Sequence, residues 1–121
     1  MALGQGDWAA ATPLFIESLG YNWQVRDYRG TAACLAALAN WCIVRGRLDE
    51  AAGLFGSVAA FLEFIHTPLL LYDQQQYEQN TRRLQAQLDK TVFGESWARG
   101  HALTHEQAVE QARAVAQTGL T

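Results

Sequence analysis

The stretch LAALANWCIVRGRLDEAAGLF, residues 35–55, decides how this sequence folds. After the turn at Arg45-Gly46-Arg47, apolar residues recur every three or four positions, which is the spacing of one helix face. That face consists of Leu48, Ala51, Phe55, Val58, Leu62 and Ile65. Period-two alternation is scarce along the whole chain, so we predict an all-α fold without strands.

The same spacing, together with residues that end helices, predicts helices over about 7–23, 30–44, 47–65, 70–90, 92–99 and 105–117. We expect the first four to form antiparallel neighbours. Pro68 ends the third, because the residue before a proline avoids the helical conformation. Gly100 is expected to end the fifth as a left-handed C-cap. Thr104 and Gln107 predict a capping box for the last helix.

A 40-residue internal repeat supports a stack of helix pairs. Shifting the chain by 40 positions aligns GDWAAATPLF (6–15) with GRLDEAAGLF (46–55), so that Gly6 meets Gly46 and Phe15 meets Phe55. A glycine relieves backbone strain at a tight inter-helix turn, and a small alanine lets two helices approach closely. Within the helix over 30–44, the segment 32–44 is apolar except for Asn40, which is typical of an inner helix buried on several sides.

Two sets of residues carry a family resemblance. The first is Leu38, Ala39, Gly46, Leu48, Ala51 and Phe55, and the second is Leu54-Phe55-Gly56, Pro68, Tyr77-Glu78, Phe93, Trp97, Gly100, Leu103-Thr104, Glu106 and Ala108. The first set resembles a tetratricopeptide repeat (TPR). The second is similar to the C-terminal end of large bacterial signalling ATPases of the LuxR/MalT and AfsR type. The resemblance implies a TPR-like right-handed α-solenoid, an alpha-alpha superhelix, with a C-terminal helical cap.

This resemblance divides the single domain, residues 1–121, into three parts. A partial first repeat covers about 4–29, a second repeat 30–66 and the C-terminal helical cap 67–121. The first repeat begins in mid-unit, so we expect the chain to be a fragment of a larger protein. The nucleotide-binding and DNA-binding segments of such regulators are not found in the sequence, so neither activity is expected of it.

The charge and hydropathy of the chain limit the classes of partner that it is expected to bind. The net charge is −3, and neither half of the chain has an excess of Lys and Arg. We therefore expect no nucleic-acid partner and no anionic membrane surface. No apolar run reaches the roughly 18 residues of a membrane span, and the N-terminus lacks the pattern of a signal peptide. These observations predict a cytoplasmic protein.

Motifs for catalysis, metal or cofactor binding are not found in the sequence, so we expect a non-enzymatic domain without cofactors. His101 and His105 are four residues apart, but a helix boundary separates them and they do not share a face. Cys34 and Cys42 lie about 12 Å apart along one helix, too far for a disulfide. We interpret them as small buried hydrophobes.

The expected function is protein interaction or regulation within a signalling or transcription-regulating protein. The concave face of a solenoid is its usual binding surface. On the inner helix that face is expected to consist of Ala33, Ala36, Asn40 and Ile43. It suits a protein or peptide partner, or other repeats of the same parent chain, with Asn40 bonding a peptide backbone. Two alternatives stay open: a small-molecule effector in the same groove, or a fourth helix that covers this face.

The first helix lacks the partner that would normally precede it. Trp8, Phe15 and Leu19 would then form an exposed apolar patch. Because a symmetric dimer would bury that edge, we expect the isolated chain to be a homo-oligomer.

Overall fold

The computed structural model describes residues 5–118, with side chains described from residue 11 onward. Within this part of the chain all regular structure is helical and no strand is present, which confirms the all-α prediction. The helices are α1 (Gln5–Gln24), α2 (Tyr28–Val44), α3 (Leu48–Ile65), α4 (Leu71–Gln87), α5 (Lys90–His101) and α6 (His105–Thr118). Among them, none combines the length and apolar character that crossing a membrane requires.

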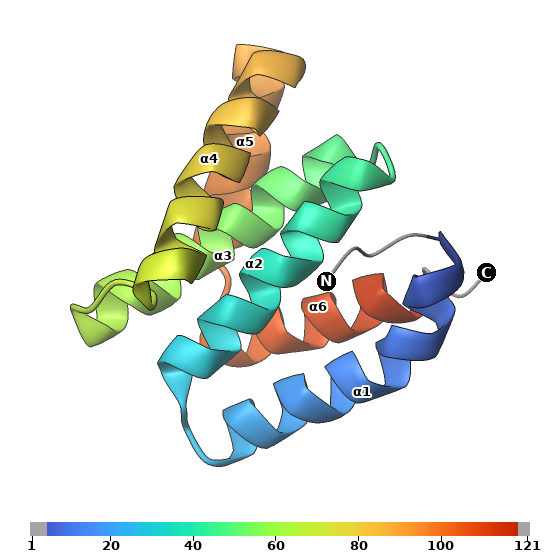
Figure 1. Cartoon of the computed structure of the whole chain (residues 1–121). Coiled ribbons are helices and arrows are strands. Elements are labelled where there is room, and N and C mark those ends of the chain that lie inside the picture. The colour runs from blue at the N-terminus through green and yellow to red at the C-terminus, as the bar shows by residue number, and fades with distance from the viewer. Residues whose placement is uncertain (1–4, 119–121) are drawn as a thin grey trace.

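An antiparallel pair of helices, α2 and α3, forms the centre of the molecule (Figure 1). On one side α1 packs against α2, and the last helix, α6, lies beside the first, α1 (Figure 1). On the other side α5 packs closely on α3, while α4 contacts both α2 and α3. The sequence predicted that 70–90 would be an antiparallel neighbour of the third helix, and α4 does contact α3. The extensive packing of α5 on α3 was not predicted.

Three turns with a left-handed residue recur every 20 residues. These residues are Arg26, Gly46 and His66, with φ of 61°, 77° and 54°. In each turn the next backbone N–H donates to a carbonyl five residues earlier, as in a Schellman motif. The bonds are Asp27 N to Asn22 O at 2.9 Å, Arg47 N to Cys42 O at 2.8 Å and Thr67 N to Leu62 O at 3.4 Å. The first three helices therefore each end in a turn of the same kind.

The 40-residue alignment of Gly6 with Gly46 is not reproduced. Gly6 lies inside α1, which begins at Gln5, so it cannot serve as a turn. Gly46 does have the predicted role, with a positive φ between α2 and α3. The structural equivalents of Gly46 are Arg26 and His66, which the sequence comparison missed because neither is a glycine. Side chains can occupy the left-handed region at a modest energetic cost.

One apolar core joins the helices. Its largest completely buried side chains are Trp41, Phe55, Phe61, Leu19, Leu35, Leu38 and Leu84. Cys42 is buried and Cys34 is half-buried, and both are free thiols. Burial raises the pKa of Cys42 to about 12 and raises that of Cys34. Both thiols therefore stay protonated and behave as packing groups.

The C-terminal segment shows one confirmed and one wrong prediction. Thr104 N donates to Gln107 Oε1 at 3.0 Å and Gln107 N to Thr104 Oγ1 at 3.1 Å, which is the predicted capping box. Gly100 is not a left-handed cap: it lies within α5, which continues to His101. Its lack of a side chain serves packing instead, because a β-carbon there would overlap the backbone of Gly53 in α3.

The α6 helix changes the expectation for the first helix. Leu19 is completely buried in the core, and Phe15 is half-buried against it. Leu19 therefore does not form part of an exposed apolar patch. The sequence predicted that α1 would lack a neighbouring helix on one side, but α6 packs beside α1. The side chain of Trp8 lies outside the described residues.

Candidate binding groove between α2 and α4

A groove of about 190 Å³ runs between α2 and α4. Alanines on α2 form part of its lining, and their small side chains leave room between the two helices. The lining residues are Ala33, Ala36, Ala37, Asn40, Tyr72, Asp73, Gln76, Tyr77 and Asn80. Small apolar groups thus lie on one wall, and polar or aromatic groups lie on the other.

Three of the four residues predicted for a binding face line this groove. They are Ala33, Ala36 and Asn40, which share one face of α2 at helical spacing. Ile43 does not line it and instead packs, half-buried, against the core. Ile43 lies one turn beyond Asn40, near the end of α2, where α3 follows through the Gly46 turn.

Sequence reasoning missed the opposite wall, which α4 supplies. Asp73, Gln76, Tyr77 and Asn80 recur at the i, i+3, i+4, i+7 spacing of one helix face. In the structure Asn80 stands out on this wall, because it is only 6% exposed although it lies on a mainly polar helix. Buried amides normally have hydrogen-bond partners.

The carboxamides of Asn40 and Asn80 decide the chemistry of the groove. Asn80 is almost completely buried and Asn40 is half-buried. Neither side chain makes a hydrogen bond to any of the described residues. Asn40 therefore makes no hydrogen bond to α4, although α4 forms the opposite wall of the groove. Each carboxamide offers two donors and an acceptor. Neither side chain contributes a polar atom that is both buried from solvent and unpaired, so the amide atoms are accessible to a ligand in the groove.

Tyr77 fixes α4 against α3. Its ring centroid lies 5.6 Å from that of Phe55, which is completely buried. Burial raises the pKa of Tyr77, and the carboxylates of Glu63 and Glu78 add to this effect. The phenol is therefore protonated at neutral pH and can donate a hydrogen bond at the groove.

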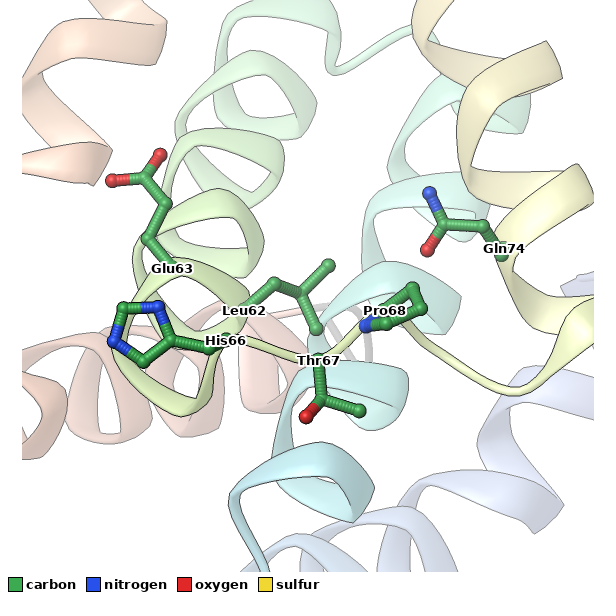
Figure 2. A pocket seen from close by; sticks show the side chains of 6 residues that line it. All are labelled: Leu62, Glu63, His66, Thr67, Pro68 and Gln74. Atoms are coloured by element: carbon green, nitrogen blue, oxygen red, sulfur yellow. The ribbon is translucent and has the colours of Figure 1, made fainter.

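A second hollow, of about 360 Å³, lies at the turn from α3 to α4 (Figure 2). Its polar side chains do not converge: Glu63 and His66 lie on the α3 side, and Gln74 lies across Pro68 on α4 (Figure 2). Gln74 Oε1 accepts from Leu69 N at 3.0 Å, and a Glu63 oxygen lies 2.9 Å from His101 Nε2. These groups already stabilise the turn and the α3–α5 contact.

The histidines have separate surroundings. His101 stacks on Trp97, with ring centroids 4.8 Å apart, and pairs with Glu63. His105 stacks on Phe61 at 4.4 Å, and burial lowers its pKa. Within residues 5–118, no group of three or more His, Cys, Asp or Glu side chains is placed to hold a metal ion.

No protein-family model, curated protein or solved structure matches this chain. The likeness to tetratricopeptide repeats and to LuxR/MalT- or AfsR-type regulators therefore stays a prediction from the sequence.

Proposed function

We propose that this chain is a non-enzymatic, TPR-like interaction domain of a larger cytoplasmic signalling or transcription-regulating protein. It binds an extended peptide segment in the groove between α2 and α4. One observation carries this proposal: Asn40 and Asn80 line the same groove, and neither carboxamide has a hydrogen-bond partner among the described residues.

A peptide backbone is the ligand that these two groups suit best. Every peptide unit presents one N–H donor and one C=O acceptor, and a carboxamide can bond both. The groove measures only about 190 Å³, and this small volume favours a main chain over bulky side chains. Such recognition gains affinity from the backbone and specificity from neighbouring side chains.

The groove suits a small effector molecule less well. Small-molecule sites are usually mainly apolar cavities of about 300–1,000 Å³. This groove measures about 190 Å³, and most of its α4 wall is polar. We therefore favour the peptide over the effector.

The test replaces each carboxamide with an apolar side chain of similar size. A random peptide library is selected on the wild-type chain, and enriched peptides are synthesised for binding measurements. We expect Asn40→Leu and Asn80→Leu to weaken binding at least tenfold. Their free energy of unfolding should stay close to that of the wild type, because neither substitution removes a hydrogen bond within the described fold. Gln85→Leu, on an exposed position of α4, is the control and should bind as the wild type does.

Three results would overturn the proposal. In the first, the library yields no binder. In the second, both Asn variants bind the enriched peptides as tightly as the wild type. A large loss of stability in Asn80→Leu would also contradict it, because the amide would then have a partner within the fold.

A further inference from the structure

The groove has one charged lining residue in the described part of the chain, Asp73. Its side chain is half-buried and forms no ion pair or hydrogen bond with the described residues. Asp73 lies in the first turn of α4, where a carboxylate also favours the helix dipole. That role needs no burial, and it does not explain why the side chain lines the groove. A carboxylate there presents an acceptor for a cationic group.

Asp73 and the two carboxamides lie toward opposite ends of the groove. α2 and α4 run in the same direction along it (Figure 1), and Arg29 Nε joins their starting ends by donating to Pro68 O at 3.1 Å. Asp73 precedes Asn80 by seven residues, or roughly 10 Å along a helix. An extended peptide covers this distance in about three residues.

Apolar side chains border the Asp73 end. Leu70, Leu71 and Tyr72 are consecutive, and they are 62%, 76% and 70% exposed. Arg29 is the nearest cation along α2, but it does not line the groove, and its guanidinium already bonds the Pro68 carbonyl. The end of the groove thus combines an unpaired carboxylate with an exposed apolar border.

We infer that the groove selects a basic peptide: a Lys or Arg side chain pairs with Asp73, about three residues from the peptide unit bonded by Asn40 and Asn80. An apolar residue next to the Lys or Arg contacts Leu71 and Tyr72. The net charge of −3 on the chain favours the encounter with such a cationic segment. This inference rests on the proposed function and names the partner of that same groove.

The probe is an array of N-acetylated, C-amidated hexapeptides in which each position is varied in turn. On the wild type we expect Lys and Arg to be selected at one position, with an apolar neighbour. Methylation of the backbone nitrogen about three residues away should abolish binding. Asp73→Asn keeps the shape and should weaken binding of the selected peptides about 2- to 5-fold, as for a partly exposed charge pair. Asp73→Arg should select Asp or Glu at the same position.

Glu95→Gln, an exposed carboxylate on α5, is the charge-matched control and should leave the selection unchanged. Circular dichroism confirms that each variant is folded. The inference is overturned if wild type shows no preference for Lys or Arg, or if Asp73→Asn keeps that preference. In either case the proposed function stands as long as Asn80→Leu abolishes binding. If Asn80→Leu binds the array as wild type does, the proposed function itself fails.

Discussion

Gly100 of α5 lies directly against the carbonyl group of Gly53 in α3, so closely that a β-carbon on Gly100 would overlap that carbonyl. α3 and α5 are equally close at Gly56 of α3, where a β-carbon would overlap the carbonyl oxygen of Trp97 in α5. Ser57 Oγ adds a buried hydrogen bond to Gly100 O at 2.9 Å. These contacts fix α5 on α3 by backbone packing, which larger residues would prevent.

Gly100→Ala should therefore destabilise the fold. Overpacking typically costs roughly 1–3 kcal/mol, and we expect the upper part of this range because the obstacle is backbone. Gly94→Ala is the matched control in the same helix, since nothing lies within 4 Å of its added β-carbon. It should stabilise the chain by about 0.5–1 kcal/mol. Urea unfolding of the two variants measures both, and equal stabilities would contradict the described crossing.

Phe55→Ala should cost about 3–5 kcal/mol, the usual range for a completely buried phenylalanine. The substitution also removes the ring that packs on Tyr77 and so loosens α4. Leu71→Ala is the comparison, because Leu71 is 76% exposed and should change stability by no more than about 0.5 kcal/mol. The melting temperatures of the two variants, measured by thermal unfolding, test this difference in stability. An unchanged melting temperature for Phe55→Ala would show that the assigned face of α3 is wrong.

Stability should fall in mild acid because of His105. Burial lowers its folded-state pKa, while the unfolded chain titrates near the ordinary value of about 6.5. Between these two values the unfolded chain binds more protons, so the stabilising effect is complete above about pH 6.5 and is lost as the pH falls through the folded pKa. His105→Phe keeps a ring on Phe61 and should flatten the decline between pH 7 and 5.

His66→Asn is the matched histidine substitution, because His66 is exposed and asparagine tolerates its left-handed backbone. An identical slope in wild type and His105→Phe would rule out His105 as the source.

Self-association, if it uses α1, should use a different face from the one expected from sequence. Leu14 and Tyr21 are 68% and 64% exposed and lie seven residues apart, on one side of the helix. We expect concentration-dependent dimers that the double variant Leu14→Glu, Tyr21→Glu abolishes. Val44→Glu, at an exposed position on α2, should leave the dimer intact. Sedimentation equilibrium tests this, and a monomeric wild type at high micromolar concentration would contradict it.

The helices could be predicted from sequence because their signals are local. Apolar spacing gave α3 within a residue, and the Thr104–Gln107 box gave the start of α6. The role of Gly100 could not be predicted, because a glycine near a helix end suits both a cap and a close crossing. Only the position of Gly53 in the neighbouring helix decides between them.

The groove was only half predictable for a similar reason. Asn40 stood out because it is the single polar side chain within the apolar segment 32–44. Asn80 and Asp73 belong to a helix that is polar on most sides, so nothing in their local sequence marked the side that faces α2. Burial by a non-adjacent helix distinguishes Asn80 from its exposed neighbours, and that burial is a property of the tertiary structure.

The most direct test of the groove observes the two carboxamides themselves. Side-chain NH₂ signals of Asn40 and Asn80 can be assigned in ¹H–¹⁵N correlation spectra by comparing wild type with Asn40→Leu and Asn80→Leu. On titration with an enriched peptide, both pairs of signals should shift and their hydrogen exchange should slow, because each amide gains a partner. Peptide binding that leaves both pairs unchanged and perturbs residues elsewhere would contradict the account.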